Sequence, residues 1–354
     1  MRPLPVLLRI YHRHRSSPQP PQSFLLPVTL SKMANPNLPP IQEIAHVSPS
    51  LIRILAGNGG KFTLQGTNTY LIGTGPNRIL IDTGEGKSSW ISALKRTLAS
   101  ENASIQHALI THWHGDHTGG IPDLLSAFPN TKVYKNQTTN HPDHDSSLIK
   151  YEQISDGQVF AVPGATLKAF HTPGHTTDHM VLHWQEQDAL FTGDNVLGHG
   201  TAVFEDLSTY LSSLNKMRTL FKGVAYPGHG LEIADGPAKI VEYLRHRQLR
   251  EDQVVQRLKS VPPPPSSSSS SSSQREGRQV NSNGGNASSS SWTLMELVRS
   301  IYQDVPETLH PAAAGGLLQI LHKLQREEKV VVVDDGGEEE RWRLVVGSGR
   351  ESAL

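Results

Sequence analysis

The densest group of metal-binding residue types in the chain lies between His112 and His117, where the order is His-Trp-His-Gly-Asp-His. The preceding stretch, Gln106–Ile110, is predicted to be a strand, so the group follows a strand end, where functional residues often lie. In extended backbone, side chains two positions apart share a face, so His112 and His114 can bind one ion. Gly115 permits a turn that directs the next two residues toward a second ion.

Three further predicted strands each end close to a candidate ligand. Ala165–Phe170 leads to His175, Ala189–Thr192 leads to Asp194, and Gly223–Tyr226 leads to His229. A glycine stands directly before each of these ligands and permits a sharp turn, so the three strand ends can converge on the first group. We predict that the first ion is bound by His112, His114 and His175 and the second by Asp116, His117 and His229, with Asp194 bridging them.

Imidazole nitrogens and carboxylate oxygens without a thiolate favour zinc, with about two ions per chain, although manganese or iron would accept the same ligands. The chain has no cysteine, which excludes thiol catalysis, disulfides and thiolate metal sites. Any one of its 18 histidines is simply explained as a surface or packing residue, but that explanation does not extend to seven ligands at these spacings.

Four other histidines near these motifs are interpreted differently. His171 shares a turn with His175 but lies on its strand side, so we expect a structural role. His141 and His144 lie in a polar loop without a preceding strand and are predicted surface residues. Two interpretations of His179 stay open: it faces the cleft and contacts substrate, or it caps the following strand.

The seven positions resemble the signature of the metallo-β-lactamase superfamily, His-x-His-x-Asp-His followed by His, Asp and His. Residues 62–71, FTLQGTNTYL, and 200–207, GTAVFEDL, are similar to the branch called β-lactamase-like protein 2, which includes fungal-type acyl-carrier thioesterases. The resemblance covers about residues 41–260 and the C-terminal part. It implies an α/β fold, an αββα sandwich with a small winged-helix-like domain.

The resemblance also implies roles for single residues. Asp82 corresponds to an aspartate that holds the metal-site loop from behind, and Asp116 is similar to the position that donates or accepts a proton in these enzymes. Thr201 is a candidate for supporting the site or contacting substrate. Related diiron proteins that handle oxygen have glutamate where His114 stands, so the histidine favours hydrolysis.

We therefore predict a binuclear zinc hydrolase in which a metal-bound hydroxide attacks the thioester of a carrier-bound or related small acyl group, of the polyketide or secondary-metabolite type. The neutral charge balance suits an uncharged acyl substrate. The alternative is an endoribonuclease for single-stranded RNA, which an arginine-bearing leader favours. A metal-binding module without turnover belongs to another class, and loss of ligands would be expected there.

The chain of 354 residues is predicted to contain two folded units. Residues 1–40 contain basic but no acidic residues and resemble a transit peptide, unless Met33 is the start. Residues 41–260 form the catalytic domain, which ends in a helix from about Pro237 to Leu258. Residues 261–291 are a Pro- and Ser-rich flexible linker, because they cannot bury enough apolar surface to fold.

Residues 292–346 are predicted to form the winged-helix-like domain and residues 347–354 a tail. Helical spacing of apolar residues indicates helices near 294–301 and 317–324, and a hairpin follows at Lys329–Val333 and Arg341–Val346. Residues 292–354 contain seven basic and eleven acidic residues, a net charge of −4, which argues against binding a phosphate backbone.

We expect a small-molecule or carrier-bound acyl substrate as partner, with RNA as the alternative, and neither DNA nor a membrane. No apolar run approaches the roughly 20 residues that cross a bilayer. The predicted location is the cytoplasm or the mitochondrial matrix, and neither secretion nor membrane insertion is expected. The sequence favours no oligomeric state.

Overall fold

Apolar residues follow one another without alternation in the central strands, which predicts burial on both faces. The computed structural model describes residues 38–137, 149–262, 291–333 and 339–345, all within one compact unit, Met33–Leu354. Every residue of β3 (Asn68–Ile72) is buried, with Tyr70 and Ile72 in one apolar cluster and Leu71 in another. The leader up to residue 37, the His141/His144 loop, residues 263–290, the acidic tip at 334–338 and the tail lie outside the described residues.

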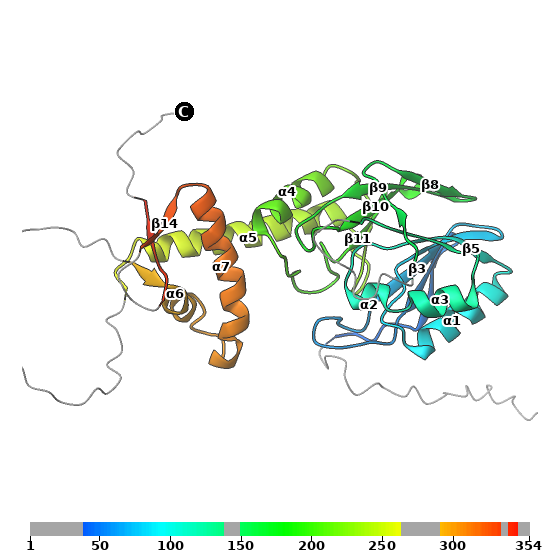
Figure 1. The fold of residues 1–354 in the computed structure, drawn as a ribbon, viewed down its shortest axis with the longest axis horizontal. Helices are drawn as coiled ribbons and strands as arrows, with labels where there is room; N and C mark the ends of the chain where they lie inside the picture. The colour runs from blue at the N-terminus through cyan, green and yellow to red at the C-terminus, as the bar shows by residue number, and fades with distance from the viewer. Residues whose placement is uncertain (1–37, 138–148, 263–290, 334–338, 346–354) are drawn as a thin grey trace, which may run out of the picture. The chain divides into compact units, whose positions relative to one another are not determined.

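The first sheet contains seven strands in sequence order. They are β1 (Ile44–Ser48), β2 (Leu51–Leu55), β3, β4 (Asn77–Ile81), β5 (Ser104–Leu109), β6 (Lys132–Lys135) and β7 (Glu152–Gln153). Neighbours are antiparallel from β1 to β4 and parallel from β4 to β7. Helices α1 (Ser88–Ser100) and α3 (Ile121–Ala127) cover one face, where Trp90 is fully buried (Figure 1).

The second sheet contains five strands in the order β12-β11-β10-β9-β8. They are β8 (Val159–Val162), β9 (Ala165–His171), β10 (Met180–Trp184), β11 (Ala189–Gly193) and β12 (Ala225–Pro227), and a short turn of 3₁₀ helix, η1 (Gln185–Gln187), precedes β11. Helices α4 (Leu207–Met217) and α5 (Gly236–Leu258) pack on its outer face through an apolar cluster that includes Val181, Leu190 and Tyr210.

The inner faces of the two sheets meet in a shared core. The ring of Tyr70 from the first sheet lies 5.1 Å from that of Phe191 and 5.8 Å from that of Tyr226, both from the second sheet. The layers are therefore helix, sheet, sheet and helix, and the predicted αββα sandwich is confirmed. The predicted strands that precede the candidate ligands are all present, with ends shifted by one or two residues.

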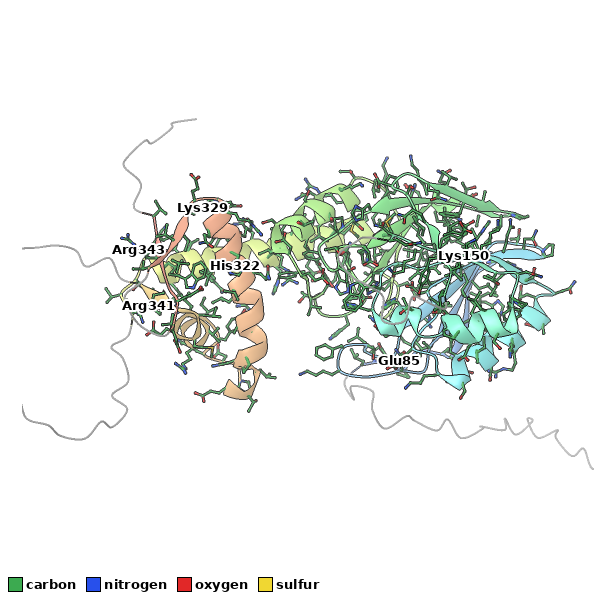
Figure 2. All side chains as sticks on the ribbon, in the orientation of Figure 1. Glu85, Lys150, His322, Lys329, Arg341 and Arg343 are labelled. Atoms are coloured by element: carbon green, nitrogen blue, oxygen red, sulfur yellow. The ribbon has the colours of Figure 1, made fainter. Side chains whose placement is uncertain are left out.

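The C-terminal residues form a three-stranded sheet with two helices, as predicted for a winged helix. Its elements are β13 (Trp292–Thr293), α6 (Leu294–Ile301), η2 (Glu307–Leu309), α7 (His310–Arg326), β14 (Val330–Val333) and β15 (Arg341–Leu344). Thr293 and Glu296 form a reciprocal capping box at the start of α6. The ring of buried Trp342 lies 5.8 Å from His322, which is labelled in Figure 2.

Helix α5 contributes to the core on the catalytic side and to that of the C-terminal domain. Its buried residues include Ile240 and Leu258, whereas Gln248 is exposed. Glu251 is buried instead because its carboxylate pairs with Lys323 of α7 at 2.8 Å. Within the described part of the chain, no helix has both the length and the apolarity needed to cross a membrane.

Two leucines of α5 give a matched test of this packing. Leu258 is 3% exposed and Leu249 is 51% exposed. We expect Leu258→Ala to lower the free energy of unfolding by about 2–5 kcal/mol, because a buried side chain leaves a cavity, and Leu249→Ala to change it by less than about 0.5 kcal/mol. Urea unfolding of both variants checks this, and equal effects would contradict the packing of α5.

Candidate metal centre

The candidate ligands come from strand ends of both sheets that meet at one edge of the sandwich. His112 and His114 follow β5, and Asp116 and His117 lie in the short helix α2 (Gly115–Thr118). From the second sheet, His175 follows β9, Asp194 follows β11, and His229 follows β12. The sandwich therefore brings seven residues from four segments together.

The seven side chains form two groups. Within each group, the ligand atoms lie within 4.8 Å of one another. The first group is His112, His114, His175 and Asp194. Nδ1 of His114 lies 3.0 Å from Nε2 of His112 and 3.1 Å from Nε2 of His175. Three ring nitrogens thus face a common point.

The second group is Asp116, His117 and His229. Nε2 of His229 lies 3.2 Å from Oδ2 of Asp116 and 3.4 Å from Nε2 of His117. Asp194 also reaches this group, because its Oδ1 lies 3.4 Å from Nε2 of His117 and its Oδ2 lies 3.2 Å from Nε2 of His229. This position between the groups suits a bridging carboxylate.

The donor set fits divalent cations. Ring nitrogens that face each other at these distances repel unless a proton or a cation lies between them. Oδ1 of Asp194 is buried and accepts no hydrogen bond from the described residues, and its ion-pair partner, Nε2 of His117, is 3.4 Å away, so a cation would be a closer partner. Nitrogen and oxygen donors without sulfur match zinc, manganese and iron alike.

Asp82 holds the first loop from behind, as the resemblance implied. It follows β4 in the left-handed region, with φ of 59°, and is buried. Its carboxylate accepts hydrogen bonds from the backbone N–H of Thr111 at 2.8 Å, from the Thr111 hydroxyl at 2.9 Å and from Nδ1 of His117 at 2.8 Å. These bonds direct Nε2 of His117 toward the second group.

Backbone carbonyls orient two further imidazoles. Nδ1 of His175 donates to the Val203 carbonyl at 2.8 Å, and Nδ1 of His229 lies 3.4 Å from the Gly66 carbonyl. In both rings the opposite nitrogen, Nε2, is left to face its group. A ring that donates on one side presents a lone pair on the other, which is the tautomer a cation requires.

The protonation states of the two groups differ. Burial, followed by the neighbouring His117 and His175, holds the pKa of His112 well below its ordinary value, and burial lowers the pKa of His114 to about 4. In the second group burial opposes the charged form, but the carboxylates of Asp194 and Asp116 raise the pKa of His229 to about 9. The rings of His112 and His114 are therefore neutral at pH 7.

Burial and neighbouring charges also have opposite effects on the pKa values of the other members of the second group. Burial disfavours the His117 cation, yet Asp194, Asp116 and Asp82 raise its pKa well above the ordinary value. Burial alone would raise the pKa of both ligand carboxyls, but His117 and His229 lower that of Asp116 to about 2 and hold that of Asp194 well below its ordinary value. Without metal, this group is a cluster of ion pairs.

Two of the three glycines before the later ligands have the expected conformational role. Gly174 and Gly193 have φ of 133° and 48°, which side chains rarely adopt. Gly228 does not have a positive φ; a Cβ there would collide with Oδ1 of Asp194 and lie 2.9 Å from Cε1 of His117. Position 115 does not require glycine, because the residue begins α2 in helical conformation and a Cβ there would meet nothing within 4 Å.

Both groups open onto a cleft of about 570 Å³, which five of the seven ligands line. Apolar side chains line much of it, including Leu64 and Leu197, and two strongly exposed residues, Phe62 (75%) and Val203 (65%), stand among its lining residues. Glu85, labelled in Figure 2, lines it from the loop between β4 and α1. The volume is that of a small-molecule site.

The remaining predicted residues lie as follows. Thr201 lines the cleft, in keeping with a substrate or supporting role. His179 is fully buried and is not among the residues that line the cleft, which favours the structural interpretation; its Nε2 accepts a hydrogen bond from the backbone N–H of Asp194 at 3.1 Å. His171 has the expected structural role, with Nε2 2.9 Å from the Thr177 carbonyl.

Sequence reasoning missed the segment that holds the His229 turn. Nδ2 of Asn68 donates to the carbonyls of Pro227 and Gly230, at 3.0 Å and 2.8 Å, and the Tyr70 hydroxyl donates to Pro227 at 2.7 Å. The Thr67 hydroxyl lies 3.3 Å from Oδ2 of Asp116. The only signal in the sequence was that these residues belong to the run 62–71.

Comparison with known proteins agrees with this geometry. The family model described as the Metallo-beta-lactamase superfamily matches residues 62–229, and that described as the Beta-lactamase associated winged helix domain matches residues 293–342. The chain is 45% identical over 295 residues to the Lactamase-like protein adaB of Aspergillus niger, covering 83% of this chain and 86% of that protein. It is also 45% identical over 295 residues to the Atrochrysone carboxyl ACP thioesterase of Aspergillus chevalieri, covering 82% and 86%.

Solved structures show the same fold. A Beta-lactamase domain protein from Burkholderia ambifaria matches with a TM-score of 0.66 at 16% identity, covering 88% of this chain and 96% of that one. A metallo-beta-lactamase family protein from Thermus thermophilus matches with a TM-score of 0.61 at 20% identity, covering 84% and 100%. At such identities the likeness concerns the fold alone.

Gly228→Ala tests the role of space at the site. The added methyl group must displace Oδ1 of Asp194, so we expect loss of bound metal and a decrease in kcat of about a hundredfold, because small misplacements of reacting groups are costly. Gly115→Ala, in the same cleft, is the control and should retain its metal. Elemental analysis of the two folded variants distinguishes them, and equal metal content would contradict this role.

Metal uptake should release protons from one group only. Because the pKa values of His117 and His229 are raised, both carry a proton at pH 7 that a cation must displace, so binding there weakens as the pH falls and strengthens as it rises. We expect about two protons released with one of two equivalents of zinc and few with the other. Calorimetry in buffers of different ionisation enthalpy measures this, and equal release for both equivalents would be inconsistent with it.

Proposed function

We propose, because the chain belongs to the metallo-beta-lactamase superfamily of hydrolases, that its metal centre hydrolyses a thioester linking an acyl group to a carrier. The observation that carries this proposal is the placement of both ligand groups in a cleft with largely apolar walls. A relative of 45% identity is named as a thioesterase for an acyl carrier protein.

The residues present would hold about two cations, with Asp194 between the two groups. Zinc is the proposed metal. When bound, two such cations lower the pKa of a water and polarise the carbonyl oxygen under attack. No protein nucleophile is needed, in agreement with the absence of cysteine from the chain.

Asp116 is the candidate for moving a proton at the reacting centre. Its side chain is 22% exposed and lines the cleft, whereas Asp194 is more deeply buried at 10%. With a pKa of about 2 its carboxylate is ionised at neutral pH, so it has no proton to donate and is only a weak base toward water. A thiolate leaving group departs without a strong acid, because thiols have pKa values near 8.5.

The apolar surface of the cleft favours an acyl chain over a charged substrate. Phe62, Leu64 and Val203 offer apolar surface close to the ligands. Burial of this surface by an acyl group is favourable, at roughly 25 cal/mol for each Å² removed from water. The carbon chain would thereby bring the thioester carbonyl to the metal centre.

One observation favours the second candidate, cleavage of single-stranded RNA. Nζ of Lys61 lies 5.4 Å from the centre of the Phe62 ring, so an exposed aromatic residue and a cation stand together in the cleft lining. Aromatic rings beside basic side chains stack and bind nucleotides in proteins that recognise single strands. This pair makes RNA the matched alternative substrate.

Turnover of two substrates decides between the candidates. Zinc-loaded protein is incubated separately with an acyl-pantetheine thioester and with a labelled single-stranded RNA. We expect thioester hydrolysis, and we expect Asp194→Ala to lower kcat by at least about a hundredfold, because it removes the carboxylate shared by both groups. Cleavage of RNA without thioester hydrolysis would overturn the proposal.

A further inference from the structure

A second cavity, of about 530 Å³, shares the segment Thr201–Val203 with the metal cleft as a common wall. Its other lining residues come from the segment that leads into α4, from α5, from Tyr302 and from α7. We call it the basic pocket because its basic lining residues are His246, Arg247 and Arg250, and no carboxylate is among the residues that line it.

These three side chains have no acidic partner within ion-pair distance among the described residues. Cations just outside the pocket are neutralised: Lys323 pairs with Glu251, and Arg326 pairs with Asp206. Burial, followed by the charges of Arg247 and Arg250, lowers the pKa of His246. The basic pocket therefore carries positive charge that no carboxylate within ion-pair distance compensates among the described residues.

The two arginines are held in place without being neutralised. Arg247 donates from Nη2 to the Ala202 carbonyl at 2.6 Å, and its guanidinium lies 4.7 Å from the centre of the Phe204 ring. The guanidinium of Arg250 lies 4.7 Å from the centre of the Tyr302 ring. Arginines fixed by rings and carbonyls retain N–H donors for a ligand and lose little freedom on binding it.

Two glycines leave room on the opposite wall. Gly315 and Gly316 lie inside helix α7, where glycine is disfavoured, and both line the basic pocket. A Cβ at either position would meet nothing within 4 Å, so packing within the chain does not require glycine here. The bare helix backbone instead permits close approach of a ligand.

We propose that the basic pocket binds the phosphate of the phosphopantetheine arm that carries the acyl group, while the thioester lies at the metal centre. This inference rests on the proposed thioesterase function. A substrate that passes the Thr201–Val203 wall can place its carbonyl in the apolar cleft and its anionic group in the basic pocket. Guanidinium groups bind phosphate through charge-assisted and often bidentate hydrogen bonds.

The test compares two thioesters with the same acyl group, one on pantetheine and one on phosphopantetheine. For the protein as it exists, we expect kcat/KM to be about tenfold higher for the phosphorylated substrate, the size of one or two charge-assisted hydrogen bonds. In Arg250→Gln this ratio should fall toward one, and His246→Gln should lower it less. Arg245→Gln, an exposed arginine of α5 outside the pocket, should keep the ratio.

Binding provides a readout that does not need turnover. The Kd values of phosphopantetheine and pantetheine are measured by calorimetry on Asp194→Ala and on Asp194→Ala combined with Arg250→Gln. The inference predicts about tenfold tighter binding of the phosphorylated compound in the first protein and little difference in the second.

Each outcome decides something different. Hydrolysis of both thioesters with equal efficiency, together with equal Kd values, overturns the basic pocket as a phosphate site and leaves the thioesterase proposal standing. Hydrolysis of neither overturns the proposed function, and the inference falls with it. A single-stranded RNA that is cleaved and displaces phosphopantetheine in an Arg250-dependent way would assign the pocket to an RNA backbone instead.

Discussion

The structure depends on one electrostatic constraint: five imidazoles and two carboxylates with converging ligand atoms are held within a few ångströms of each other at the edge of a protein core. Such a cluster is costly in a buried setting unless protons or cations compensate it. In the first group the rings of His112 and His114 are neutral, while in the second group protonated His117 and His229 compensate the carboxylates. A pair of divalent cations would satisfy both groups at once, including Oδ1 of Asp194, which accepts no hydrogen bond from the described residues.

The remainder of the fold serves to keep these groups in place. The two sheets are joined by a shared core, so strand ends that are far apart in the sequence cannot drift from each other. The Asp82 carboxylate accepts a hydrogen bond from the first loop, and the Asn68 side chain donates one to the turn that contains His229. Backbone carbonyls orient the ring of His175 and face that of His229. Because His117, His175 and His229 have partners outside the metal groups, less binding energy is spent on ordering these rings.

Much of this arrangement was predictable because it is local in sequence. Strands that end in glycine and a ligand are recognisable without any knowledge of contacts, and the helix–sheet–sheet–helix layers followed from the resemblance. The hydrogen bond from the Tyr70 hydroxyl to the Pro227 carbonyl was not predictable, because it joins residues 157 positions apart and corresponds to no periodic pattern in the sequence. The requirement for glycine at position 228 was also not predictable, since the sequence does not show that the Asp194 carboxylate occupies the space of a side chain there.

The ability to bind two cations in these two groups is the claim on which the proposed chemistry depends. Elemental analysis of protein purified under metal-replete conditions tests it most directly, with His114→Ala and His229→Ala as variants that each disturb one group. The account predicts about two ions per chain in the unaltered protein and about one in each variant. Metal-free protein under these conditions, or an unchanged count in both variants, would contradict it.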